Sequence, residues 1–506
     1  MAMILPRTDS RVRTLRRAPP WALTGKMIRE GEMRHHWGMI AALAVLVSGQ
    51  SVAAPRRAVP AKAAPVAAKP APVAAPKPAV TKIAPLPDTP EIQALRRAFR
   101  FGFAPYEMLR TRQAQAARMQ AAGMGSGINA LVPRLTLADA SSREVTTPNN
   151  DTLYGSAWLD LSQGPVFFTI PPLNRYHSAA LMSITSDVVA LLGTRTVGTA
   201  GGRYAIVGPN FAGDLPKGVE MVRSQSNDAW LLVRVVVNGP DDLAAAADGL
   251  TRYTLSAVGG DNPIDLAVPA KPDAKAFLTT VNLAIERSGD ERLQARARGF
   301  ADQGIGTPWE QLSPELQKLW TDSLPALVAE LKDGLAGGET VNGWSYPPQN
   351  MAFYGEDDDL RARVALGGLA ALPRVEAVYF TARSDGEGKP LTGDKSWRLK
   401  IPPGLPVGAF WSLTMYQQEE DGRLFFVPNE LDRFAVGDRS RHLRPERDGS
   451  IELFIQNPRP SGERVVNWLP APKGKFVLVF RAYLPGAGLL DGSVRLPPVS
   501  EDEMIP

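Results

Sequence analysis

The chain has 506 residues, too many for a single core, and its 44% hydrophobic and 22% charged residues are typical of globular proteins. Residues 1–87 contain fourteen of the 57 basic and three of the 52 acidic residues, so the remaining 43 basic and 49 acidic residues make the rest of the chain mildly acidic. This distribution argues against a nucleic-acid partner, and the absence of cysteine excludes disulfide bonds, thiolate zinc sites and cysteine catalysis.

Residues 1–54 are expected to contain a cleaved signal peptide. A short polar start, Met33–His36, precedes the apolar run Trp37–Ser48, which is too short to span a bilayer, and small residues follow at 52–54. We therefore expect a periplasmic or secreted protein with no transmembrane span in its mature chain. Because this signal has its own polar start, residues 1–32 are interpreted as an extension of the gene model.

Residues 55–90 are expected to form a linker. The stretch is rich in Ala, Pro and Lys, and residues 55–87 carry six positive charges with no acidic or aromatic side chain. Prolines prevent a helix and the composition cannot form a core, so an extended polyproline-like segment is expected. Two interpretations remain: a plain spacer, or a weak tether to the anionic envelope through residues 55–87.

Residues 91–260 are expected to form a helix followed by a first β domain. Helical spacing over 91–122 is interrupted near Gly102–Pro105, which predicts a break there. Short apolar runs separated by Gly, Pro, Asn and Asp then predict strands, namely Val166–Ile170, Ala179–Ile184, Tyr204–Val207 and Leu231–Val237.

Residues 261–345 are expected to be helical and residues 346–506 to form a second β domain. Asp273 and Ser313-Pro314 are helix-start signals. Asp421-Gly422 and Asp448-Gly449 predict hairpin turns, and alternation along 451–456 and 476–481 predicts half-buried strands. The predicted fold is mainly β, with two β-sandwich (jelly-roll-like) domains joined by a helical segment.

Several blocks of the sequence resemble two families of unknown function. Thr147–Leu161, with Arg175-Tyr176 and 193–209, resembles the domain of unknown function 1254 (DUF1254). Phe410–Tyr416 and Asn467–Pro472, with Phe476 and Arg481, resemble its usual companion, the domain of unknown function 1214 (DUF1214). The resemblance covers roughly residues 95–500. It implies two β-sandwich-like domains, in proteins that bacteria usually export, and it implies no agreed reaction.

Only two histidines lie beyond residue 54, His177 and His442. His177 is expected at a strand start and His442 in a charged loop. No Gly-x-Ser-x-Gly elbow occurs, so neither histidine is favoured as part of a serine hydrolase triad. Two separated histidines also do not make a multi-histidine metal site.

The segment 148–154 is the first candidate site. Asn149, Asn150 and Asp151 supply closely spaced oxygen atoms, and Tyr154 supplies an amphipathic ring. Such a group can hydrogen-bond a polyhydroxylated ligand, or Asp151 can ligate a hard cation such as Ca²⁺. The alternative is ordinary turn chemistry, in which Asn and Asp bond their own backbone.

Two further groups of residues are candidate ligand sites. The first group lies in the first β domain and consists of Arg175, Tyr176, Arg195 and Arg203. If these side chains converge, they form a clamp for an anion. The alternative is that the arginines pair with nearby acids. The second group lies in the second domain and consists of Trp411, Tyr416, Asn467 and Trp468. These aromatic and amide side chains can bind a sugar by stacking, or they belong to the core of the domain.

We therefore predict an envelope protein that binds or processes a small molecule or a glycan in its first β domain. The alternative is a non-catalytic scaffold that self-associates through its β faces, and a homo-oligomer is compatible with either. If the protein is an enzyme, a hydrolase or lyase acting on envelope material is the expected class. No spacing indicates a cofactor or a confident metal site.

Overall fold

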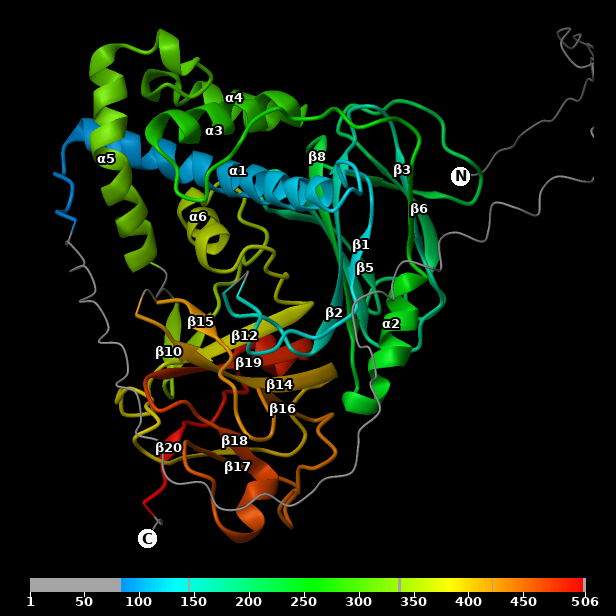
Figure 1. Ribbon diagram of the computed structural model, residues 1–506, viewed down its shortest axis with the longest axis vertical. Helices are drawn as coiled ribbons and strands as arrows, with labels where there is room; N and C mark the ends of the chain where they lie inside the picture. The colour runs from blue at the N-terminus through cyan, green and yellow to red at the C-terminus, as the bar shows by residue number, and fades with distance from the viewer. Residues whose placement is uncertain (1–82, 144–145, 335–337, 421, 504–506) are drawn as a thin grey trace, which may run out of the picture. The chain divides into compact units, whose positions relative to one another are not determined.

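The computed structural model describes residues 83–143, 146–334, 338–420 and 422–503 (Figure 1). The signal peptide and most of the linker expected from the sequence lie outside these residues. Among the described residues, no helix combines the length and the apolar character that crossing a bilayer requires.

The first β domain consists of two sheets that face each other across a core of Leu, Val, Ile and Ala side chains. The five-stranded sheet contains, in spatial order, β1 (Val132–Arg134), β2 (Thr152–Asp160), β8 (Asp228–Val236), β4 (His177–Ser183) and β5 (Val188–Gly193). The four-stranded sheet contains β7 (Glu220–Arg223), β6 (Gly202–Val207), β3 (Val166–Ile170) and β9 (Thr254–Ala257).

The second β domain has the same plan, with two sheets around a core that includes three tryptophans. Its larger sheet contains β10 (Glu339–Val341), β11 (Trp344–Tyr346), β12 (Ala377–Ala382), β19 (Phe476–Pro485), β14 (Val407–Gln418) and β15 (Leu424–Phe425), and β16 (Ala435–Gly437) also pairs with β14. The smaller sheet contains β18 (Trp468–Pro470), β17 (Ile451–Gln456), β13 (Trp397–Ile401) and β20 (Ser500–Glu501). The mainly β fold predicted from the sequence is confirmed.

Helices cover the outer face of the five-stranded sheet, on the side away from the four-stranded one (Figure 1). They are α1 (Pro90–Ala121), α3 (Ala274–Ser288), α4 (Glu291–Arg298), α5 (Pro314–Asp333) and α6 (Asp358–Gly367), while α2 (Leu243–Thr251) and α7 (Ala487–Asp491) pack elsewhere. Asp273 and Ser313, the two expected helix starts, are the N-caps of α3 and α5. Their side chains accept hydrogen bonds from Ala276 N and Leu316 N.

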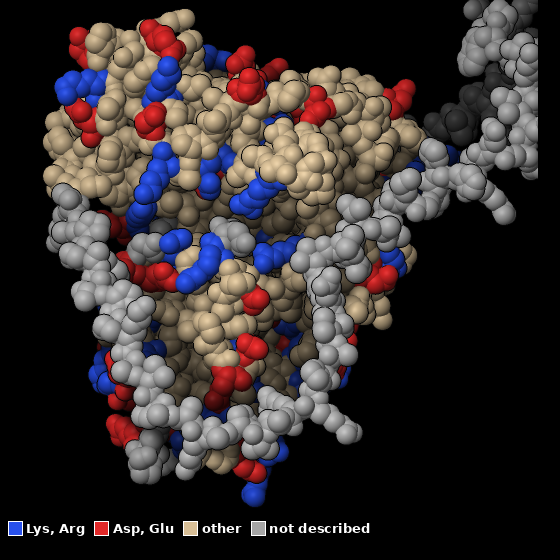
Figure 2. All heavy atoms as spheres, in the orientation of Figure 1, with Lys and Arg blue, Asp and Glu red and all other residues tan. Residues whose placement is uncertain are grey.

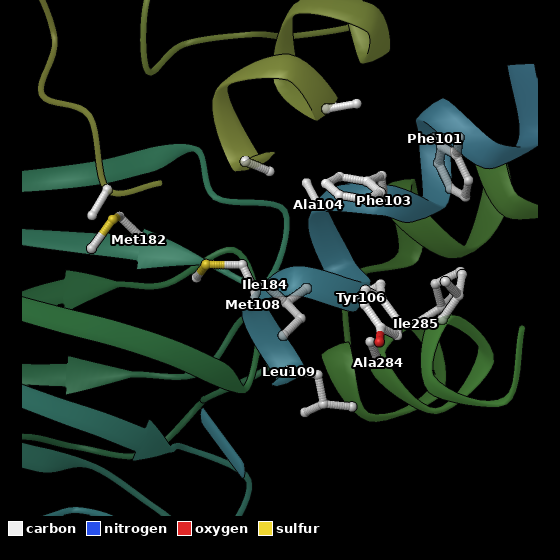
Figure 3. Close-up of a cluster of buried hydrophobic side chains, with 14 of the residues drawn as sticks. Phe101, Phe103, Ala104, Tyr106, Met108, Leu109, Met182, Ile184, Ala284 and Ile285 are labelled. Carbon is white, nitrogen blue, oxygen red and sulfur yellow. The ribbon is translucent and has the colours of Figure 1, made fainter. Parts of the chain in front are cut away.

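The predicted break in the first helix is wrong, since α1 is one helix of 32 residues that contains Pro105. Its apolar face packs on α3 and on Met182 and Ile184 of the first β domain (Figure 3). A Cβ on Gly102 would lie 3.0 Å from Val281, so glycine permits close contact with α3. Burial on several sides outweighs the roughly 3 kcal/mol that proline costs inside a helix.

The prediction of half-buried strands is also wrong for β19. Phe476, Leu478 and Phe480 face the core of the second domain as expected. The alternate side chains are buried as well, among them Val477 and Arg481, because the first domain and the segment that leads into β2 cover that face. Alternation therefore identified the strand but not the second layer that covers it.

Asp448-Gly449 forms a turn in which Glu446 N donates to Ser450 O. The strand that follows it, β17, pairs with β13 and β18 and not with the preceding β16. The predicted hairpin is therefore absent at this position in the described chain, because the two strands beside the turn belong to different sheets.

His177 lies at the start of β4 and is fully buried. Its Nε2 is 3.2 Å from the carbonyl oxygen of Gly198, and its Nδ1 is 2.7 Å from the hydroxyl of Tyr253. Both nitrogens are thus engaged by the fold, and burial lowers the pKa of the imidazole. These contacts support the structural interpretation of this histidine.

We expect stability to fall as the pH is lowered from 7 to 5. The unfolded chain binds a proton at His177 near pH 6.5, whereas the folded chain, with its lowered pKa, resists protonation, so acid favours unfolding. His177→Gln should reduce this slope in urea denaturation measured at both pH values. An unchanged slope in His177→Gln would contradict this account.

Candidate functional site

The loop before β2 lies against the second β domain and not at a free surface. Tyr416 Oη donates to the carbonyl oxygen of Pro148 at 2.5 Å, and Asn149 Nδ2 donates to Tyr483 Oη at 2.8 Å. Asn150 Nδ2 donates to the carbonyl oxygen of Ala138. The loop therefore forms part of the contact between the two domains.

Asp151 is buried and both of its carboxylate oxygens accept hydrogen bonds from the second domain. Ser412 Oγ lies 2.6 Å from Oδ2, and Arg439 Nη2 lies 2.6 Å from Oδ1. The Arg439 guanidinium also stacks on the ring of Phe410 at 3.9 Å. A hard cation at Asp151 would have to displace these donors, and no group of three or more Asp, Glu or His suited to a metal occurs in the described part of the chain.

The arginines of the predicted anion clamp do not share one site. Arg175 donates to both carboxylate oxygens of Asp242, at 2.5 and 3.1 Å. Arg195 donates to Glu376 at 2.9 Å, and the other oxygen of Glu376 accepts from Tyr176 Oη at 2.9 Å. Arg203 is exposed on β6. Arg175 and Arg195 thus pair with acids of the protein itself, which is the alternative to an anion clamp.

Three of the second-domain candidates have structural partners in the core. Trp411 is buried and stacks on Phe480. Trp468 Nε1 donates to the carbonyl oxygen of Gln456, and the amide of Asn467 bonds the backbone of Arg444 on both sides. The core interpretation fits these three residues.

Five of the candidates converge at the interface of the two domains. Tyr176 packs edge-on against Tyr483 at 5.3 Å between ring centroids, and Tyr483 is the residue that binds Asn149. Phe410 stacks on Tyr483 at 4.1 Å and carries Arg439 on its ring. Asn149, Asp151, Tyr176, Arg195 and Tyr416 therefore belong to one network, although not to the clamp that was predicted.

Arg234 at the centre of this interface is the residue that sequence reasoning missed. It lies on the outer face of β8, opposite Tyr154 on β2 and Ser178 on β4, and only 4% of it is exposed. Its Nη2 donates to the carbonyl oxygen of Ala370 at 2.9 Å, while Nε and Nη1 have no hydrogen-bond partner. Among the residues that the structure describes, no carboxylate forms an ion pair with it.

Tyrosines and not acids surround this guanidinium. Its Cζ lies 5.5 Å from the ring centroid of Tyr154, and Tyr176, Tyr379 and Tyr483 are close enough to interact with its charge. Burial raises the pKa of Tyr176, Tyr379 and Tyr483, so their hydroxyls stay uncharged at neutral pH. The positive charge of Arg234 is therefore buried without a negative partner.

Arg481 lies beside this group on the second domain. It is directly opposite Tyr379 on β12 and Ser412 on β14, and it donates to the hydroxyls of Thr414 and Tyr416 at 2.6 Å each. Burial raises the pKa of Tyr416 to about 12, so this partner is neutral as well. We call Arg234, Arg481, Tyr154, Tyr379 and Tyr483 the tyrosine–arginine cluster.

Backbone strain accompanies the cluster. Ala370, whose carbonyl binds Arg234, has a φ of 67°, and Leu484, which follows Tyr483, has a φ of 52°. Thr147, before the loop that binds Tyr483, has a φ of 52°. Each such conformation costs about 1–3 kcal/mol for a non-glycine residue and tends to occur at functional sites.

Tyr154 and Tyr379 are the partly buried members of the cluster, whereas Arg234, Arg481 and Tyr483 are buried. On the face drawn in Figure 2, Lys and Arg side chains gather between α1 and β15, where the surface is hollowed. Such a distribution attracts anions toward this side of the molecule.

A sequence signal for the cluster did exist. Arg234 interrupts the apolar run Leu231–Val237, and Arg481 interrupts the run 476–484. An arginine inside a strand that is otherwise apolar must either lie on an exposed face or be buried at a cost. The sequence does not show which, because the covering layer comes from distant segments.

Comparison with known proteins supports the fold and gives no activity. The family model of DUF1254, a protein of unknown function, matches residues 128–256, and that of DUF1214, also of unknown function, matches residues 376–487. No curated protein matches the chain.

Two solved structures are similar to the chain. The crystal structure of the VPA0106 protein from Vibrio parahaemolyticus has a TM-score of 0.62 at 20% identity and covers 81% of this chain and all of its own. An uncharacterised protein from Burkholderia cenocepacia has a TM-score of 0.39 at 14% identity, over 82% of this chain and 90% of its own. The first supports the fold alone.

Asp151→Ala is expected to destabilise the protein by about 3–5 kcal/mol, because it leaves Arg439 without its buried partner. The double variant Asp151→Ala/Arg439→Ala should be less destabilised than the sum of the two single variants. Denaturant unfolding measures all three. Asp248→Ala removes an exposed ion pair with Arg252 and should change stability by less than about 1 kcal/mol. Equal losses for Asp151→Ala and Asp248→Ala would contradict the interdomain role.

Proposed function

For this protein, which carries a DUF1254 domain followed by a DUF1214 domain, we propose that the tyrosine–arginine cluster binds a small organic carboxylate. The observation that supports the proposal is the buried, unpaired guanidinium of Arg234. A buried charge without a partner costs several kcal/mol, and a bound anion removes this cost.

The free nitrogens of Arg234 are the recognition element. With Nη2 held by Ala370, Nη1 remains free to donate to a carboxylate oxygen. Hydrogen bonds between ions are roughly twice as strong as neutral ones. The carboxylate is therefore expected to bind here and not at Arg175 or Arg195, which already hold Asp242 and Glu376.

The tyrosines are expected to select the rest of the ligand. Tyr154 and Tyr379 present partly exposed rings beside Arg234, one from each domain. Aromatic walls favour a flat or apolar body, and their hydroxyls can bond ligand oxygens. An uncharged glycan would leave the charge of Arg234 unpaired, so a carboxylate is favoured over a neutral sugar.

The described structure offers no group of residues that would specify a hydrolase or a lyase. The buried His177 is occupied by Tyr253 and Gly198, and the exposed His442 lies in a loop outside the cluster. Binding, without an assigned reaction, is therefore the function that the geometry supports.

We also propose that the protein acts in the periplasm or outside the cell. The support is the order of the polar start, the apolar run Trp37–Ser48 and the small residues at 52–54. The Pro-rich stretch that follows would then separate the folded domains from the site of export.

Arg234→Met is expected to abolish carboxylate binding without loss of stability, because it removes a buried unpaired charge and keeps the apolar stem. In thermal-shift assays with acetate, benzoate and succinate, at least one should stabilise the wild-type chain, by about 2.7 kcal/mol at 100 times its Kd. Benzamide, which lacks the charge of benzoate, should have less effect. The melting temperature of unliganded Arg234→Met should equal or exceed that of wild type.

Arg203→Met is the matched control, because Arg203 is an exposed arginine of the same domain. It should keep the full response to carboxylates. A response that persists in Arg234→Met would place the site elsewhere. No response in wild type, together with an unstable Arg234→Met, would make Arg234 structural and favour the scaffold.

Export predicts a processed chain. Expression of the full gene in a bacterium, followed by fractionation and N-terminal sequencing, should yield a periplasmic protein that begins near Pro55. A cytoplasmic chain that keeps residues 33–54 would contradict the proposed location.

A further inference from the structure

A cavity lies on the first domain, apart from the tyrosine–arginine cluster. It has a volume of about 290 Å³ and lies between the C-terminal half of α1 and the segment 261–268. Most of its wall is apolar and includes Ile128, Ile264, Leu266 and Val268. Its size is near the lower limit of small-molecule sites, with room for about ten non-hydrogen atoms.

The segment that roofs this cavity is held in place at three points. Gln113 Nε2 donates to the carbonyl oxygens of Ile264 and Leu266, at 3.0 Å each. Tyr106 Oη donates to the carbonyl oxygen of Pro269. Asp160 accepts from Asn262 N at 2.8 Å. The cavity is therefore formed by the fold before any ligand binds.

Arg112, a buried arginine with one unsatisfied donor, is among the residues that line the cavity. Arg112 is 1% exposed, its Nη1 donates to Gln113, and its Nε and Nη2 have no hydrogen-bond partner. Nε lies 3.3 Å from a carboxylate oxygen of Asp228, which is close enough for an ion pair. Nη2 is thus the atom that lacks an acceptor.

The charge of Arg112 is already balanced, in contrast to that of Arg234. Arg287 bridges Asp160 and Asp228, with distances of 3.1 Å and 2.8 Å. Together with Arg112, two arginines face two carboxylates under α1. Asp261 adds a further negative charge to the cavity wall. A negatively charged ligand would therefore be repelled, and an uncharged acceptor fits better.

We propose that this cavity binds a small uncharged amphiphile, with a carbonyl oxygen that accepts from Arg112 Nη2 and a short alkyl chain along Ile128, Ile264 and Leu266. Burial of the chain supplies affinity at roughly 0.8 kcal/mol per CH₂ group. This site shares no residue with the tyrosine–arginine cluster, and its ligand differs in charge.

The test compares 2-octanone with octanoate, which match in length and differ in charge. Calorimetric titration of the mature chain should show saturable binding of 2-octanone, with octanoate at least tenfold weaker. In addition, ¹³C NMR of carbonyl-labelled 2-octanone should show a bound signal shifted downfield, as expected for a carbonyl that accepts a hydrogen bond.

Ala117→Phe places a large side chain at the cavity wall, one helical turn after Gln113 on the same face of α1. It should weaken 2-octanone binding at least tenfold and remove the shifted NMR signal. Ala121→Phe lies a further turn along the helix and outside the cavity wall, and it should bind like wild type.

Three results would overturn the proposal: no binding of 2-octanone to wild type, equal binding by both variants, or octanoate binding as tightly as the ketone. Benzoate binding at Arg234, measured on Ala117→Phe, is independent of these outcomes. A failure of this site therefore leaves the proposal for the tyrosine–arginine cluster unaffected.

Discussion

Buried charge on the outer face of the five-stranded sheet is the constraint on which the rest of the structure depends. Asp160 and Asp228 are buried at one end of β2 and β8, and Arg234 is buried near the other end. An uncompensated buried charge costs several kcal/mol, so whatever covers this face must also bring partners. Helices α1 and α3 bring Arg112 and Arg287 to the carboxylates, whereas the second domain brings tyrosines and a backbone carbonyl to Arg234.

The two ends of the face are therefore electrostatically different. Under α1, each carboxylate meets an arginine and the cluster is neutral. At the domain interface, the acids present are already taken, Asp151 by Arg439 and Glu376 by Arg195. The protein thus holds an unpaired guanidinium at a position where packing alone would favour an apolar side chain. Buried charged side chains that lower the stability of a fold are commonly retained because they bind a ligand. The strained backbone at Ala370, which holds Arg234, also fits a binding role.

Particular elements show which features can be predicted from the sequence and which cannot. The strand over Val166–Ile170 and the helix after Ser313-Pro314 were predictable, because periodicity and capping depend on residues a few positions apart. The continuous α1 and the doubly buried β19 were not, because both depend on layers that distant segments supply. Likewise the loop at 149–151 was identified as polar and important, but its partners Tyr483, Ser412 and Arg439 lie more than 260 residues away.

By itself the sequence determined that the chain has two β domains of the DUF1254 and DUF1214 type with helices between strand-rich parts, and it indicated Asn149, Asp151, Tyr176 and Arg195 as candidate site residues. Only the tertiary structure decided which arginine has a partner. Arg175, Arg195 and Arg234 are equivalent in charge and reach, and all three lie among strands of the first domain. What distinguishes them is whether a carboxylate from another segment arrives within about 4 Å, and that distance is set by the packing of two domains and not by neighbours in the chain.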